Sequence, residues 1–164
     1  MDGVHAMLEH GIHGTAADGA YSVVLSAGYK DDKDSGRTFT YTGAGGKSTG
    51  DGPAQRSDIW GPQRSDQTVD NRSNQALLTS VQTKRPVRVV RGPNPNSLWA
   101  PVKGYRYDGL YIVDEMLDSE LGADGYKVIK FKLRRIEGQP PLSGSNKKDR
   151  QDRMLKIGKR GSRG

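Results

Sequence analysis

Two tyrosines and a cluster of aspartates lie within one short stretch of the chain, residues 18–46. Tyr29 and Tyr41 provide two aromatic faces, and the neighbouring Asp31, Asp32 and Asp34 provide hydrogen-bond acceptors. Aromatic side chains stack on nucleobases, and a carboxylate accepts a hydrogen bond from an exocyclic amine. These residue types indicate a pocket for a planar, amine-bearing ligand such as a nucleobase.

The same residues also have ordinary structural interpretations. Tyr29 and Tyr41 are also typical of cross-strand or core tyrosines, and Asp32 of a turn carboxylate. Gly43, Gly45 and Gly46 are typical of turns, and they also permit close approach of a backbone to a ligand. Residue types alone leave both interpretations open.

The elements that must position these residues are mostly strands. Residues 18–46 resemble a β-hairpin, and residues 117–124 an acidic turn. A helix is expected over 73–83, with Ser73 as its N-terminal cap. A long polar loop is expected over 47–67, and another loop over 1–17 that has room for one short extended piece. Patterns of apolar and β-favouring residues predict strands over 20–27, 37–42, 86–91, 109–116 and 126–136. We therefore predict an α+β, mostly β fold: a curved, mostly antiparallel, barrel-like sheet with a flanking helix and long loops.

Composition limits the domain organisation. The 164 residues suffice for one domain with a real core, and 32% are hydrophobic. No apolar run approaches 18 residues, so no membrane span is expected. The chain contains no cysteine, which excludes disulfides and thiolate zinc sites. We expect one domain over residues 1–142, followed by a basic, flexible tail over 143–164.

The positive charge is concentrated in that tail. The chain has a formal net charge of +7, and residues 146–164 contain eight Lys or Arg and two Asp. Such a segment can attract nucleic acid in a salt-dependent, sequence-independent way. A solvated terminus without a ligand is the alternative.

A metal site has little support in the sequence. His10 and His13, beside Glu9, are the only cluster that resembles metal ligands, and no third nitrogen or sulfur ligand is evident. We expect no metal ligand and no catalytic residue here.

Four blocks of the sequence resemble a known family when taken in order. They are DGAYSVVLSAGYKDD, FTYTGAGG, RPVRVVR and YRYDGLYIV, preceded by Gly11-Ile12-His13-Gly14. They are similar to the SRA domain, which is also called YDG after the tripeptide Tyr107-Asp108-Gly109. The resemblance spans roughly residues 4–136.

The resemblance implies a PUA-like fold and a non-enzymatic reader of 5-methylcytosine that flips the base out of double-stranded DNA. It is strongest to the ubiquitin-like, PHD and RING finger proteins of DNA-methylation maintenance. It therefore implies a nuclear protein that binds methylated CpG as a monomer, without a cofactor, in chromatin that contains further protein partners. Ubiquitin ligase or other catalytic modules would lie outside this chain.

The resemblance also assigns roles to particular residues. Tyr29 and Tyr41 would stack on the two faces of the flipped base, and Asp32 would accept a hydrogen bond from the cytosine N4 amine. Backbone N–H groups of Thr42 and of the segment Ser26, Ala27 and Gly28 would donate to the base.

Two loops would enter the DNA. The first contains Glu9, His10 and Gly11. The resemblance implies a small apolar residue at the position where this chain has Glu9. A carboxylate there faces phosphate repulsion and a desolvation cost. The second loop follows the glycines and contains Gly45, Gly46, Lys47, Arg56 and Arg64, with Arg56 and Arg64 as candidate finger residues and Trp60 as a candidate wedge. These departures leave open the preference between hemimethylated and fully methylated sites.

Other readings compete with a methylation reader. Asp31 and Asp32 could belong to an enzyme that acts on DNA, or to the targeting domain of a modification-dependent enzyme. A chromatin or protein-interaction module could instead bind DNA non-specifically through the basic tail. Arg88 and Arg91 are either solvent-facing strand residues or phosphate contacts, and the YDG tripeptide is interpreted as a structural turn that leads into a strand.

Overall fold

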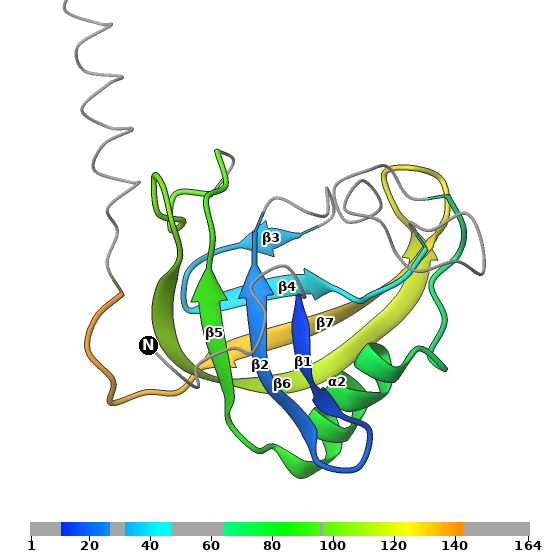
Figure 1. Ribbon diagram of the computed structural model, residues 1–164, viewed down its shortest axis with the longest axis horizontal. Coiled ribbons are helices and arrows are strands. Elements are labelled where there is room, and N and C mark those ends of the chain that lie inside the picture. The colour runs from blue at the N-terminus through cyan, green and yellow to red at the C-terminus, as the bar shows by residue number, and fades with distance from the viewer. Residues whose placement is uncertain (1–10, 27–31, 47–63, 96, 143–164) are drawn as a thin grey trace, which may run out of the picture.

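A computed structural model describes residues 11–26, 32–46, 64–95 and 97–142, apart from the side chains of residues 118–120 (Figure 1). The described strands form one sheet in the order β1-β2-β5-β6-β7-β4-β3. The elements are β1 (Ile12–Thr15), β2 (Gly19–Leu25), β3 (Lys33–Asp34), β4 (Thr38–Thr42), α2 (Arg72–Thr83), β5 (Val87–Arg91), β6 (Arg106–Leu121) and β7 (Lys127–Arg135).

The sheet is curved and open, with β1 and β3 at its two edges. The long strands β6 and β7 bend along their length, and α2 lies at one end of the sheet (Figure 1). Strands β2 and β5 are parallel, whereas the other neighbours are antiparallel. A parallel pair needs a long crossover connection, and α2 lies within it. The prediction of a mostly β, mostly antiparallel curved sheet with one flanking helix is confirmed; the described strands do not close into a barrel.

The hydrophobic core lies between α2 and the face of the curved sheet that packs against it. Leu77 of the helix is fully buried, and Leu78 and Val81 pack against the cluster. On β7, the alternating residues Ile129, Phe131 and Leu133 are buried, and Lys130 between them is buried too. The other large members of the cluster are Val23, Leu25, Phe39, Tyr41, Val87, Val89, Tyr111 and Val113.

The helix begins one residue earlier than expected, and its cap is a different residue. Asn71 is the N-terminal cap, because its side chain accepts hydrogen bonds from the backbone N–H groups of Ser73 at 2.9 Å and Asn74 at 3.4 Å. Ser73 itself lies inside the first turn, so the prediction that it caps the helix was wrong. Asparagine and serine are similarly favoured as caps, which is why the sequence did not separate them.

Residues 18–46 do not form a hairpin. Strand β2 pairs with β1 and β5, and β4 pairs with β7 and β3. The alternation of side chains identified both strands, but it carries no information about which strands are neighbours. The short extended piece allowed within the loop over 1–17 is β1. The predicted turn over 117–124 is wrong at its start, because β6 continues to Leu121.

Candidate functional site

Asp32 and Thr42 lie together where β3 and β4 meet. Asp32 directly precedes β3, and Thr42 is the last residue of β4. The two strands are antiparallel with Lys33 opposite Thr40, so the start of one strand lies beside the end of the other. The Asp32 carboxylate accepts a hydrogen bond of 2.7 Å from the backbone N–H of Thr42. The structure thus brings together two of the predicted base-binding residues.

The side chain of Thr42 is buried without a hydrogen bond. The residue is 1% exposed, and its Oγ1 is the only buried side-chain polar atom without a partner in the part of the chain that the structure describes. An unsatisfied buried hydroxyl costs about 1–3 kcal/mol, and such a group usually has an explanation in water or ligand binding. The sequence assigned only the backbone N–H of Thr42, so this hydroxyl is an addition to the candidate site.

Tyr41 belongs to the core, with 5% of its surface exposed. Its hydroxyl donates to the carbonyl oxygen of Val24 at 3.3 Å, and its ring meets Phe39 edge-on with centroids 6.4 Å apart. Gly11 lies against the same hydroxyl, because a Cβ at that position would come within 2.5 Å of it. The ring orientation is therefore fixed by the fold. Stacking of Tyr41 on a ligand stays a prediction.

The other predicted base-binding residues are near the end of β2. Ser26 directly follows β2 and is half-buried beside Gly92, where an added Cβ would lie 3.2 Å from the Cβ of Ser26. Ala27, Gly28 and Tyr29 lie outside the described residues. The structure therefore describes one of the two predicted aromatic faces.

The two predicted DNA-contacting loops are described only where they leave the sheet. In the first, the carbonyl of Gly11 accepts from the N–H of Val24 at 2.7 Å. In the second, the carbonyl of Gly46 accepts from the N–H groups of Arg64 at 2.6 Å and Ser65 at 3.0 Å. The two ends of the second loop are thus held together. Outside the described residues lie Glu9, His10, Lys47, Arg56 and Trp60.

Two buried amide side chains hold the glycine-rich segment that follows Thr42. Asn74 of α2 accepts from the N–H of Ala44 at 2.8 Å and donates to its carbonyl at 3.0 Å. Gln67 donates to the carbonyl of Gly43 at 2.6 Å and accepts from the N–H of Ile129 at 2.9 Å. A Cβ on Gly43 would lie 2.5 Å from the Asn74 amide oxygen, so this approach requires glycine. Sequence reasoning missed both amides, because no local pattern distinguishes a buried Gln or Asn from an exposed one.

Arg91 is fully buried at the centre of an ion-pair network. Two of its guanidinium nitrogens donate to Asp34, each at 2.9 Å, and a third donates to Asp108 at 2.7 Å and to the Tyr111 hydroxyl at 3.1 Å. The carbonyl of Gly36 accepts the fifth hydrogen bond, at 2.9 Å. All five guanidinium donors are therefore used. Such a network fixes Asp34, which lies only two residues after Asp32.

The pKa values reflect this network. Burial alone would raise the pKa of Asp34, but the hydrogen bonds and positive charge of Arg91 lower it below its usual value. Burial alone would lower the pKa of Arg91, but Asp34 raises it. The pKa of Tyr111 is raised, mainly by burial. The buried ion pair is therefore charged at neutral pH.

This network corrects two expectations. Arg91 is neither solvent-facing nor accessible to a phosphate, and Arg88 is the exposed member of the pair. The YDG tripeptide lies inside β6 and does not form a turn before it. Asp108 is 5% exposed and binds both Arg91 and Arg106, so the motif has a structural role.

The described residues give no sign of a metal site or a membrane span. They contain no group of three or more His, Cys, Asp or Glu side chains placed to hold a metal ion. Within the same ranges no helix has the length and apolar character needed to cross a membrane.

Comparisons with known proteins place this geometry in one family. The family model described as the SAD/SRA domain matches residues 1–139. The chain is 46% identical over 144 residues to a UHRF1-like protein of Cryptococcus neoformans var. grubii. The aligned region covers 86% of this chain and 42% of that protein. The chain therefore spans less than half the length of this relative.

Solved structures with the same fold include both an enzyme and a DNA complex. A structure described as the modification-dependent TagI restriction endonuclease has a TM-score of 0.72 and 38% identity, covering 82% of this chain and 45% of that one. The SUVH5 SRA structure, described as bound to fully hydroxymethylated CG DNA, has a TM-score of 0.64 and 39% identity. The match covers 86% of this chain and 83% of that one. Together with the match of the family model, these findings show that the chain belongs to the SAD/SRA domain family.

Proposed function

We propose that this domain binds double-stranded DNA with methylated CpG and reads 5-methylcytosine after the base has been flipped out of the duplex. The observation that carries the proposal is the Asp32–Thr42 pair. It combines a carboxylate acceptor, which the backbone N–H of Thr42 holds in place, with a buried hydroxyl that has no partner among the described residues. Cytosine presents an N4 amine that can donate a hydrogen bond to a carboxylate, whereas thymine presents a carbonyl oxygen at the same edge. The DNA-bound SUVH5 SRA structure supports the choice of ligand.

The energetic requirement is to offset unstacking, which costs a few kcal/mol. Stacking on an aromatic side chain contributes about 1–3 kcal/mol per base, and we assign this role to Tyr41 and Tyr29. A carboxylate has about four lone-pair sites, so Asp32 can accept from Thr42 and from the base amine together. Burial of the methyl group contributes only about 0.8 kcal/mol, so discrimination against unmodified cytosine should be modest.

The remaining features of the proposal concern the rest of the chain. Residues 1–142 act as the reader domain and residues 143–164 as a basic tail, which agrees with the end of the family match at residue 139. The domain acts as a monomer on DNA, without a cofactor and without catalysis. We place it in the nucleus, on chromatin, because its proposed ligand is methylated CpG DNA. Glu9, His10, Gly11, Gly45, Gly46, Lys47, Arg56 and Arg64 would contact DNA beside the flipped base.

Titrations at one fixed salt concentration test the proposal. The duplexes share one sequence and carry unmodified, hemimethylated, fully methylated or hydroxymethylated CpG, and fluorescence anisotropy reports binding. We expect methylated duplexes to bind several-fold more tightly than the unmodified one. A fluorescent base analogue beside the CpG should brighten on binding if the cytosine leaves the stack. Equal affinity for all four duplexes would contradict the proposal.

Removal of residues 146–164 separates a methylation reader from a module that binds DNA through its tail. Loss of these basic residues should lower the affinity for every duplex and reduce the salt dependence, because fewer counterions are released. The preference for methylated DNA should persist. If the preference disappears together with the tail, the tail and not the Asp32–Thr42 site recognises DNA.

Replacement of Thr42 by valine tests the buried hydroxyl. Valine has nearly the same shape, so the change removes an unsatisfied polar group, and the free protein should gain about 1 kcal/mol of unfolding free energy. We expect the affinity for a methylated duplex to fall several-fold at the same time, because the hydroxyl no longer bonds the ligand. Urea unfolding and anisotropy measure the two effects. Unchanged affinity would remove the hydroxyl from the site.

A second candidate function is the targeting of an enzyme to modified DNA. The TM-score of 0.72 with the modification-dependent TagI endonuclease favours it. In this case the domain would bind the same ligand, and the cleavage residues would lie in another part of a longer protein. Incubation of methylated duplex with this chain and Mg²⁺ should then produce no nick, whereas cleavage by this chain would show that it contains the catalytic residues itself.

A further inference from the structure

A second pocket lies at the opposite end of β4 from the Asp32–Thr42 pair. It has a volume of about 620 Å³, within the usual range for small-ligand sites. Thr38, at the start of β4, lines it, whereas Thr42 lies four residues further along the strand, roughly 13 Å away. The lining residues are Arg37, Thr38, Trp99, Arg134, Arg135, Ile136, Glu137, Gly138, Gln139, Pro141 and Leu142.

The pocket contains guanidinium groups without an acidic partner. Arg37 is exposed, and its side chain makes no hydrogen bond or ion pair with the described residues. Among the described residues, Arg135 donates a side-chain hydrogen bond only through its Nε, to the carbonyl of Asp108 at 3.1 Å. Arg134 differs, because it pairs with Asp114 at 3.1 Å. Two arginines of this pocket are thus available to an anion.

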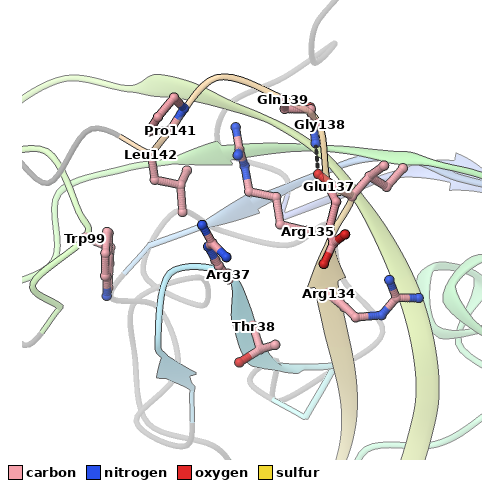
Figure 2. Close-up of a pocket in the computed structure, with 11 residues that line it drawn as sticks. Arg37, Thr38, Trp99, Arg134, Arg135, Glu137, Gly138, Gln139, Pro141 and Leu142 are labelled. Carbon is pink, nitrogen blue, oxygen red and sulfur yellow. Dashed lines mark hydrogen bonds between the residues drawn. The ribbon is translucent and has the colours of Figure 1, made fainter.

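Trp99 forms an apolar wall beside these cations. The indole lies on Gly36, where an added Cβ would come within 2.6 Å of the ring, and Gly36 has a φ of +83°. The backbone of Trp99 is held at both ends: its N–H donates to Ser97 Oγ at 3.2 Å, and its carbonyl accepts from the guanidinium of Arg106. Figure 2 shows Trp99, Arg37 and Leu142 on one side of the pocket and Glu137 and Arg134 on the other.

The segment that closes the pocket is also fixed to the sheet. Gln139 accepts from the backbone N–H of Leu110 at 2.8 Å and donates to its carbonyl at 2.9 Å, like one more residue of a strand. The same amide donates to the carbonyl of Ile136 at 2.8 Å. These bonds hold the turn that carries Glu137 and Gly138. The pocket is therefore formed before a ligand binds, which lowers the entropic cost of binding.

We propose that this arginine–tryptophan pocket binds a short acidic peptide segment of a partner protein. A carboxylate or phosphorylated side chain of the peptide lies between Arg37 and Arg135, and a neighbouring apolar side chain packs on Trp99. Arginine clusters recognise acidic and phosphorylated motifs through charge-assisted hydrogen bonds. The indole and the carbons of Leu142 provide the apolar contact that a peptide side chain needs.

A peptide fits this pocket better than a DNA backbone does. Glu137 lines the pocket and would repel a continuous row of phosphates, whereas it can accept a hydrogen bond from a peptide N–H. The pocket is concave, while the surface of a duplex is convex. Trp99, Ile136, Pro141 and Leu142 give the lining an apolar part, as in peptide sites, whereas phosphate contacts are mainly basic or polar.

The test uses two synthetic peptides and the indole N–H signal of Trp99. One peptide is Ac-Gly-Glu-Leu-Gly-NH₂, which carries a single carboxylate, and the other carries phosphoserine beside leucine in an otherwise neutral sequence. In ¹⁵N NMR spectra, Trp60→Phe assigns the remaining indole signal to Trp99. We expect at least one peptide to shift this signal in a saturable way, and comparison of the two distinguishes carboxylate from phosphate recognition.

Arg37→Glu is expected to weaken peptide binding by about tenfold or more, because it reverses the charge that faces the anion. Arg85→Glu is the matched control: it makes the same charge change at an exposed residue outside the pocket and should change affinity less than about twofold. Arg37→Ala provides a milder second variant, and circular dichroism verifies folding of each.

Three outcomes would overturn the proposal. In the first, neither peptide shifts the Trp99 signal in a saturable way. In the second, the two charge reversals weaken peptide binding equally, which indicates non-specific attraction. In the third, a short unmodified duplex shifts the Trp99 signal and displaces the peptides, which makes the pocket a DNA phosphate contact. Because these measurements use no methylated DNA, they are independent of the proposed reader function.

Discussion

Replacement of Asp32 by asparagine is expected to weaken binding of a methylated CpG duplex by about 10- to 100-fold. A hydrogen bond to a charged group contributes about 1.5–3 kcal/mol, and each 1.4 kcal/mol is a factor of ten. Asparagine keeps one acceptor oxygen for the N–H of Thr42, which now bonds the carboxylate at 2.7 Å. Its amide nitrogen is a donor, and it would face the donor amine of cytosine. Anisotropy titrations on methylated and unmodified duplexes measure the loss.

The same variant should change the preferred base. Thymine presents a carbonyl where cytosine presents an amine, so the asparagine amide can donate to thymine. We expect the affinity of D32N for a duplex with a G·T mismatch at this position to rise relative to the methylated duplex. Asp70→Asn is the control, because Asp70 is exposed and loses the same charge. Equal losses on methylated and unmodified duplexes would remove Asp32 from base recognition.

Arg91→Met is expected to lower the unfolding free energy by about 3–5 kcal/mol, because it leaves buried carboxylates without their cation. Domains of this size have only about 5–15 kcal/mol in total, so the variant is close to unfolding. Asp108 keeps Arg106 as a partner, so the cost falls mainly on Asp34, whose cationic partner among the described residues is Arg91. Urea unfolding at neutral pH measures the effect. Because the pKa of Asp34 is lowered, its carboxylate stays charged until the pH falls below 3.8, the usual pKa of an aspartate. The contribution of this ion pair to stability is therefore lost only at that acidic pH.

Arg88→Met is the matched control on the same strand. Arg88 is exposed, and surface substitutions usually change stability by less than about 0.5 kcal/mol. We also expect folded Arg91→Met protein to bind methylated DNA less well than wild type, because Asp34 fixes the short strand next to Asp32. Arg91→Met and Arg88→Met proteins of equal stability would contradict the role given to this network.

Strands and the helix were predictable because burial leaves a local pattern. Apolar residues that recur every second position on β7, such as Phe131 and Leu133, point to one face, and Leu77 and Val81 share a face of α2. The boundaries were less accurate. Strand β6 runs through the acidic residues after Met116, because pairing with β7 continues to Leu121 and outweighs the low β propensity of Asp and Glu.

The candidate site was predictable only in its residue types. Asp32, Tyr41 and Thr42 were identified through the resemblance to a family, and the structure then placed Asp32 against Thr42. Local sequence could not show that the Thr42 hydroxyl is buried without a partner, since burial depends on neighbours from other elements. The same reason hid Gln67 and Asn74, which hold the glycine-rich segment from 22 to 30 residues away in sequence.

The sequence by itself determined the alternation of the strands, the position of the helix, the concentration of basic residues after residue 142 and the family. Tertiary structure decided which distant groups meet. Arg91 pairs with Asp34, 57 residues away, and Trp99 contacts Gly36 and lines the same pocket as Arg37 and the end of β7. The physical reason is that a side-chain pattern encodes only which face of a strand is buried. The partners across that face depend on the order and register of the strands, which are set by packing of the whole sheet.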